Sequence, residues 1–163
     1  MCIRDRSWYL STINFPKKIK YIGDEAFYGL YQLTCPIYLP KDIYIGDRAF
    51  YNCSRITEVT VAGEPSHIGE EALYLTGLTT VNVLTSTPPD FDPSTAFTSD
   101  GDPNLSEVTL NVPVGTKETY AADSKWNVFG TINEKDFSET TQTVTSKSIN
   151  VETAGTLEEL MSD

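Results

Sequence analysis

The chain contains an internal repeat with a period of 23 residues, and this repeat limits its possible folds more than any other feature. The segment YIGDEAFYGL begins at Tyr21, YIGDRAFYNC begins at Tyr44, and HIGEEALYLT begins at His67. The matched columns hold Ile, Gly, Ala, then Phe or Leu, then Tyr. A fixed period of this length is typical of repeat proteins, in which each unit buries its apolar side chains only against its neighbours.

Each repeat has two halves with different patterns. The upstream half alternates apolar and polar residues and is rich in β-branched side chains, which predicts a short strand. Its apolar pairs are Ile13/Phe15, Val59/Val61, Val81/Val83 and Val108/Leu110. The downstream half has apolar residues three and four apart, which predicts a helical or 3₁₀ turn. We therefore predict an α/β repeat: a leucine-rich-repeat solenoid with one short parallel strand and one such turn per coil of about 23 residues.

Stacking of the coils explains why small residues recur at fixed positions of the repeat. Strands of adjacent coils lie about 4.8 Å apart in a parallel sheet. The repeated glycine suits a backbone that either has a positive φ or passes close to the next coil, and the repeated alanine suits tight packing. We expect the isoleucines to form one buried column. The three columns are Gly23, Gly46 and Gly69; Ala26, Ala49 and Ala72; and Ile22, Ile45 and Ile68.

The unit L..I.FP..I..IGDEAFYG resembles the BspA-like (Treponema-type) leucine-rich repeat of bacterial surface proteins. Residues 109–136 include TLNVPVGTKETYAADSKWNVFGTINE and resemble the C-terminal closing segment of that family. The resemblance implies a last strand, a turn at Pro113–Gly115 and an amphipathic helix ending near Trp126. The loop Thr85–Phe97 resembles the Pro-rich loop that precedes this closure. The resemblance also implies an extracellular location on a bacterial cell surface and a role in adhesion.

The chain divides into four parts at the sequence level. We interpret residues 1–6, MCIRDR, as the translation of a sequencing adapter, and residues 7–136 as the repeat domain with its closing segment. Residues 137–148 are Thr/Ser-rich and lack hydrophobic periodicity, which favours a linker. Residues 149–163 resemble the truncated start of a following domain.

Within the second repeat, an offset of Pro40 against the pattern predicts a bulge near Pro36.

Charge and hydropathy disfavour several classes of partner. The chain has 12 Lys and Arg against 23 Asp and Glu, for a net charge of −11. Nucleic acid and anionic membranes would repel it, and no run of about 18 apolar residues is present to span a bilayer. We therefore expect neither nucleic acid nor direct membrane insertion, and we predict a monomeric module.

No set of residues in the sequence predicts catalysis or a cofactor. The sole histidine, His67, stands where the other repeats have Tyr, so we place it at the edge of a coil. Cys53 falls in a column expected in the core, whereas Cys35 could be exposed; together with one histidine they cannot make a zinc site. The carboxylates that recur after each Ile-Gly pair are predicted to form a solvated row. We therefore predict a non-enzyme without cofactor or metal.

One acidic loop resembles the start of a calcium loop and leaves the question of calcium open. Asp100, Asp102 and Asn104 match the first three oxygen positions, but Leu105 replaces the required glycine and Asn111 the bidentate carboxylate. We favour a solvated turn at this place.

The outward side of the predicted sheet is the candidate binding surface. Residues between the buried pairs of each strand point to the concave side. The candidate ligand-binding residues are Thr12, Asn14, Tyr38, Glu58, Thr60, Thr80, Asn82, Glu107 and Thr109, with Pro36 beside Tyr38. Such rigid polar side chains suit a protein backbone or sugar hydroxyls. We predict a non-enzymatic recognition module for an extracellular protein or glycan; the alternatives are a structural spacer and an accessory module of a secreted enzyme.

Overall fold

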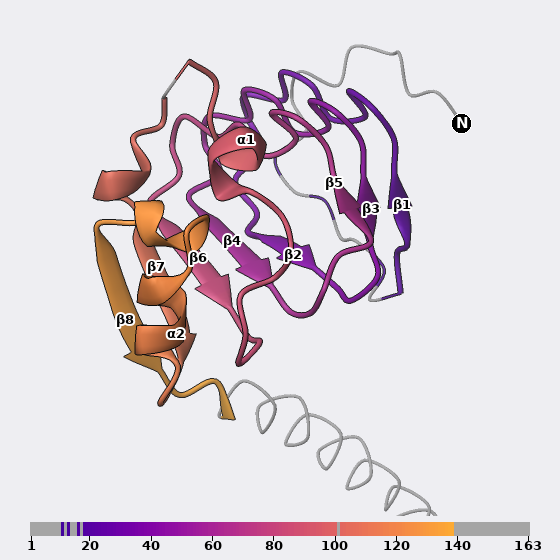
Figure 1. Ribbon diagram of the computed structural model, residues 1–163. Helices are drawn as coiled ribbons and strands as arrows, with labels where there is room; N and C mark the ends of the chain where they lie inside the picture. The colour runs from indigo at the N-terminus through magenta and orange to yellow at the C-terminus, as the bar shows by residue number, and fades with distance from the viewer. Residues whose placement is uncertain (1–10, 12, 14–15, 17, 101, 139–163) are drawn as a thin grey trace, which may run out of the picture.

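The computed structural model describes residues 11, 13, 16, 18–100 and 102–138, and in these the coils stack side by side (Figure 1). Two parallel sheets face each other across the core, one with five strands and one with three. The parallel repeat architecture predicted from the sequence is therefore present. The predictions made for residues 1–6, 139–148 and 149–163, and for Thr12 and Asn14, lie outside the described residues.

The larger sheet carries the alternating halves of the repeats. Its strands are, in spatial order, β2 (Ile37–Leu39), β4 (Glu58–Val61), β6 (Thr80–Val83), β7 (Thr109–Pro113) and β8 (Thr131–Lys135). All neighbouring pairs are parallel. The inward side chains, such as Val59 and Val81, are fully buried, and the residues between them face outward. Period-two alternation of β-branched residues therefore sets the two faces, as expected for a half-buried strand.

The smaller sheet was not predicted from the sequence. Its strands are β1 (Tyr21–Ile22), β3 (Tyr44–Ile45) and β5 (His67–Ile68), paired in parallel so that residues 23 apart are neighbours. Strands of two residues are too short to show an alternation in the sequence. The pairing aligns the predicted isoleucine column: Ile22 and Ile45 are buried, and Ile68 is half-buried at the last strand of this sheet.

The segment predicted as a helical or 3₁₀ turn forms isolated turns whose local hydrogen bonds span three residues. Ala26 N–H donates to the carbonyl of Gly23 at 3.3 Å, three residues earlier, but the next N–H, of Phe27, donates to Ala49 in the next coil at 2.7 Å. Local and inter-coil bonds thus alternate along the turn. Glu25 has a φ of 53°, and Arg48 has 54° at the same position of the next repeat. These left-handed residues interrupt helical geometry while letting each coil bond to its neighbour.

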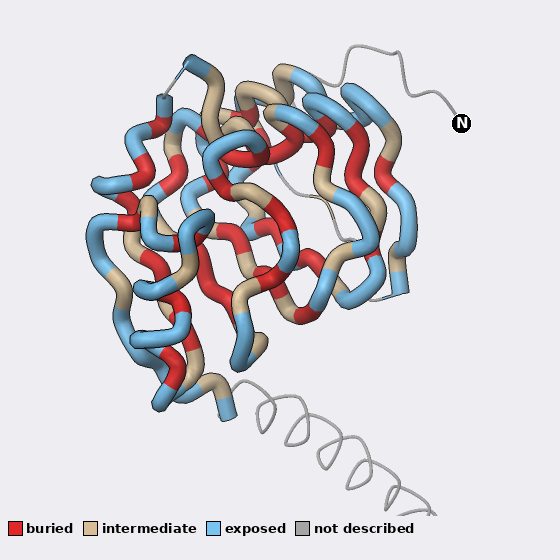
Figure 2. Tube along the Cα trace, viewed as in Figure 1, coloured by how far each residue is buried: buried red, intermediate tan, exposed pale blue. Residues whose placement is uncertain are grey.

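The apolar interior runs along the stack between the two sheets (Figure 2). The rings of Phe27 and Phe50, at the same position of successive repeats, stack with centroids 5.0 Å apart and so join these two coils. Ala49 and Ala72 are fully buried, as predicted. Ala26 is exposed, contrary to prediction, because its coil contains β1, the edge strand of the small sheet.

The C-terminal part closes the same sheet with a strand, a helix and a further strand. The short helix α1 (Pro93–Phe97) and the 3₁₀ helix η1 (Leu105–Glu107) precede β7, and α2 (Lys117–Ala122) and the 3₁₀ helix η2 (Trp126–Val128) precede β8. The prediction of one helix reaching Trp126 is wrong. Asp123 ends α2, and its carboxylate accepts the N–H groups of Lys125 and Trp126 at 2.9 and 3.1 Å, which starts a new turn.

The bulge predicted near Pro36 is also absent from the described strand. Ile37, Tyr38 and Leu39 pair continuously with residues 22 positions later on β4. Tyr44 pairs with His67, 23 positions later. The offset changes because the connection from β2 to β3 is one residue shorter than the connection from β4 to β5. A shorter loop therefore absorbs the irregular spacing, and the outward position of Tyr38 is unaffected.

Candidate functional site

The outward side of the five-stranded sheet carries two rows of polar side chains, which we call the outer face. Strand register places each residue beside its partner on the next strand, and alternation with the buried residues places them all on one side. The first row is Glu58, Thr80, Thr109 and Thr131, and the second is Tyr38, Thr60, Asn82, Asn111 and Asn133. Helix α2 lies on the opposite side, where Glu134 accepts the N–H groups of Gly115 and Lys117 at 2.9 and 3.3 Å.

A chain of hydrogen bonds crosses three strands of the outer face. The amide nitrogen of Asn111 on β7 donates to Oδ1 of Asn82 on β6 at 2.8 Å. The amide nitrogen of Asn82 donates in turn to Oε1 of Glu58 on β4 at 2.6 Å and to the hydroxyl of Thr60 at 3.4 Å. These neighbours cover Asn82, which is only 3% exposed. These hydrogen bonds orient the side chains of Asn111, Asn82 and Glu58 relative to one another.

The structure places most, but not all, of the predicted binding residues on this face. Tyr38, Glu58, Thr60, Thr80, Asn82 and Thr109 belong to it. Glu107 does not, because it lies in η1, before β7 begins. Pro36 is exposed and precedes β2. Thr12 and Asn14 lie outside the described residues.

Sequence reasoning missed three members of the outer face, namely Asn111, Thr131 and Asn133. The signal was present in the sequence: a Thr, an apolar residue and an Asn recur in this order on β6, β7 and β8. The register pairs all three copies residue for residue. This recurrence identifies the strand starts better than the apolar pairs do. It aligns Thr80 with Thr109, so the strand begins after Glu107 and not at it.

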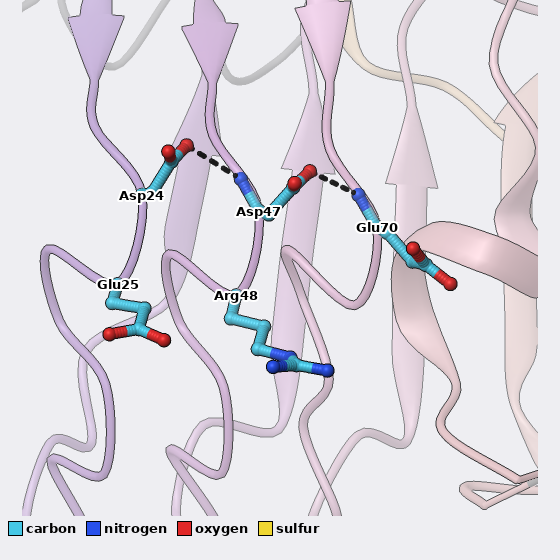
Figure 3. Close-up of a pocket in the computed structure, with 5 residues that line it drawn as sticks. All are labelled: Asp24, Glu25, Asp47, Arg48 and Glu70. Atoms are coloured by element: carbon cyan, nitrogen blue, oxygen red, sulfur yellow. Dashed lines mark hydrogen bonds between the residues drawn. The ribbon is translucent and has the colours of Figure 1, made fainter.

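The recurring carboxylates on the other side of the molecule have a structural role that was not predicted. One oxygen of Asp24 accepts the backbone N–H of Asp47 at 3.0 Å, and one oxygen of Asp47 accepts that of Glu70 at 2.9 Å. Figure 3 shows these bonds running from coil to coil beside Glu25 and Arg48, which line the same open hollow. The row is exposed to solvent, as predicted, and two of its aspartates also join successive coils.

Comparison with known families agrees with this geometry. A family model described as the BspA type leucine-rich repeat region matches six copies over residues 5–99, which is more than half of the chain. The chain belongs to the BspA-type leucine-rich repeat family. Repeats of this type are typical of interaction modules in bacterial surface proteins and are generally non-catalytic. No curated protein matches the chain. The match ends before residues 109–136, so their resemblance to the family's closing segment stays a prediction.

The remaining polar candidates follow the matched BspA-type repeats and have structural partners. Asp102 accepts the hydroxyl of Tyr74 at 3.2 Å, and Asn104 accepts the N–H of Ser106 at 3.1 Å as the N-cap of η1. Burial, followed by the contact with Asp102, raises the pKa of Tyr74. Within the residues that the structure describes, no three His, Cys, Asp or Glu side chains are grouped to hold a metal ion. No helix in this part of the chain is long and apolar enough to cross a membrane.

The cysteines and the histidine of the BspA-type repeats also have packing roles. Cys53 is fully buried, and its thiol donates to the carbonyl of Phe27 at 3.2 Å. Burial raises the pKa of this thiol to about 11. Cys35 is half-buried, and Cys35 and Cys53, the two cysteines among the described residues, are free thiols. His67 is exposed at the edge of the small sheet and stacks on Tyr44 with centroids 4.7 Å apart, as expected for a coil-edge residue.

Proposed function

We propose that this chain is an extracellular recognition module of a bacterial surface protein and that it binds its ligand through the outer face. One observation carries the proposal: on a polar sheet face, hydrogen bonds orient the side chains of Asn111, Asn82 and Glu58 across three strands. Side chains whose rotamers are fixed before binding lose less conformational entropy when the ligand associates. The family match supports a role in interactions, and the net charge of −11 disfavours nucleic acid as the partner.

Affinity per module should be modest. The sheet is five short strands wide, and at about 4.8 Å per strand it offers an interface of well under ~1,000 Å². Adhesion by such a module would depend on several copies acting together, since linked weak sites raise the effective concentration of the second contact.

The test compares variants on the two sheets. Tyr38 and Thr60 are neighbours on the outer face, whereas Tyr21 is an exposed tyrosine on β1 of the small sheet. The double substitution Tyr38→Lys/Thr60→Lys should abolish binding to immobilised extracellular proteins and polysaccharides, measured by biolayer interferometry. Tyr21→Lys is the matched control and should leave binding unchanged. Absence of binding by the folded wild-type chain, or equal binding by the double variant, would favour the spacer or accessory-module alternative.

A further inference from the structure

The hydrogen bonds of the outer face fix which of its atoms remain for a ligand. A carboxylate only accepts, so Glu58 fixes the amide nitrogen of Asn82 toward β4 and its oxygen toward β7. That oxygen accepts from Asn111, and the Asn111 oxygen is therefore directed away from Asn82. Among the described residues, none donates a hydrogen bond to Oε2 of Glu58 or to Oδ1 of Asn111. The face thus offers two oriented acceptors.

Hydroxyl groups lie beside these acceptors in the first row. Thr80 and Thr109 are paired neighbours on β6 and β7, and both are half-buried. A threonine hydroxyl can turn to donate or accept. Fixed acceptors flanked by adaptable hydroxyls fit a ligand that carries several O–H groups at close spacing.

Tyr38 adds an aromatic ring to this polar set. It is 49% exposed and has no ring partner among the described residues. Tyr21 and Tyr28 are also exposed, but each stacks on the tyrosine of the next coil, with centroids 4.9 and 5.0 Å apart. Those two rings support the coil stack, whereas both the exposure and the isolation of Tyr38 leave its ring face free to take an apolar surface.

The charges of the outer face favour a neutral ligand. Among its described residues Glu58 is the one carboxylate, and alternation along β8 places Lys135 on the same side of the sheet, so the two opposite charges give a basic peptide little net attraction. An anionic ligand would meet Glu58 and the overall charge of −11. A sugar ring combines an apolar C–H face with a rim of hydroxyls and carries no charge.

We propose that the outer face binds a neutral glycan, with a sugar ring stacked on Tyr38 and further hydroxyls donating to Glu58 and Asn111. This rests on the proposed function and names its ligand class. Tyr38, Thr60, Asn82 and Asn111 lie in one row across four strands, which spans about 14 Å at the usual strand spacing. A short oligosaccharide lying across the strands reaches all of these contacts.

Affinity electrophoresis of the full chain tests the proposal. The gels contain soluble mannan, galactomannan, xyloglucan or β-1,3-glucan, and retardation by at least one of them is expected. Tyr38→Ala and Glu58→Gln should each weaken that retardation at least tenfold, Tyr38→Phe should preserve it because the ring remains, and Tyr21→Ala should not alter it. Circular dichroism checks that each variant folds. Retardation that is equal in Tyr38→Ala and the wild type, or no retardation by any of the four polysaccharides, overturns the glycan proposal.

A parallel arm with immobilised gelatin and laminin separates this proposal from the proposed function. If these proteins bind and Tyr38→Lys/Thr60→Lys abolishes that binding while no polysaccharide retards the chain, recognition through the outer face stands and the glycan is wrong. If neither the proteins nor the polysaccharides bind, both proposals fail.

Discussion

The side chain of Asp24 accepts the backbone N–H of Asp47, the residue at the same position in the next coil, at 3.0 Å. Asp47 repeats the bond to Glu70 at 2.9 Å. A hydrogen bond from a backbone N–H to a carboxylate is charge-assisted, as in the capping of a helix N-terminus by an aspartate. The aspartates after the first two Ile-Gly pairs therefore contribute to the stacking of the coils.

The first prediction concerns this bond. Asp47→Ala removes the acceptor for Glu70 N–H and should lower the free energy of unfolding by about 1 kcal/mol. Asp47→Asn keeps a side-chain oxygen at the same place and should cost less than Asp47→Ala. Urea unfolding followed by circular dichroism measures both variants. Equal stability of Asp47→Ala and the wild type would show that the bond contributes nothing in water.

The second prediction compares two glycines at the same repeat position. A Cβ on Gly46 would lie 2.6 Å from the backbone nitrogen of Asp24 and 2.9 Å from the carbonyl carbon of Gly23. Gly46→Ala should therefore destabilise the fold by about 1–3 kcal/mol, since backbone atoms must move apart. Gly23→Ala is the control, because its Cβ would meet nothing closer than the Tyr21 ring at 3.5 Å. Equal losses in the two variants, measured by urea unfolding, would contradict this account.

These glycines show how much of the fold could be predicted from the sequence. The 23-residue period was enough to predict parallel stacking and the aligned isoleucines, because stacked coils must place equivalent residues side by side. It left open whether the glycines are needed because the backbone has a positive φ there or because a neighbouring coil passes close to them. In the structure the left-handed position belongs to Glu25 and Arg48, and Gly46 is small because the preceding coil passes close to it.

The candidate site was predicted less completely for a different reason. Tyr38 and Asn82 follow from alternation alone, but β7 begins only after η1, so a strand predicted from Val108 and Leu110 placed Glu107 wrongly on the face. Helix η1 depends on the cap by Asn104, a local interaction that hydrophobic periodicity does not report. The hydrogen bonds from Asn111 to Glu58 connect residues 53 apart and follow only from the register.

The third prediction concerns the reactivity of Cys53. Its thiol is buried, and its pKa is raised from 9.0 to about 11, so little reactive thiolate is present at pH 8. In a Cys2→Ser/Cys35→Ser background, alkylation of Cys53 by iodoacetamide should be slow in the native chain and should accelerate at least tenfold in urea. The matched Cys2→Ser/Cys53→Ser variant reports half-buried Cys35 and should react faster under native conditions. Equal native rates at the two sites would contradict the burial of Cys53.

The last prediction is a dependence of stability on pH through Glu71. Its carboxylate accepts the hydroxyl of Ser99 at 2.5 Å and pairs with Arg48 at 2.7 Å, and these contacts hold its pKa below the ordinary value of 4.5. A depressed pKa means that the carboxylate stabilises the fold above pH 4.5 and loses this contribution as the pH falls through the folded-state pKa. Glu71→Gln cannot ionise, so its deficit in free energy of unfolding should be largest near pH 6 and should shrink toward pH 3. Glu70→Gln, which removes an exposed carboxylate next to Glu71, is the control for the loss of one negative charge in urea unfolding. A deficit of Glu71→Gln that stays constant with pH would assign the loss to packing and not to the charge.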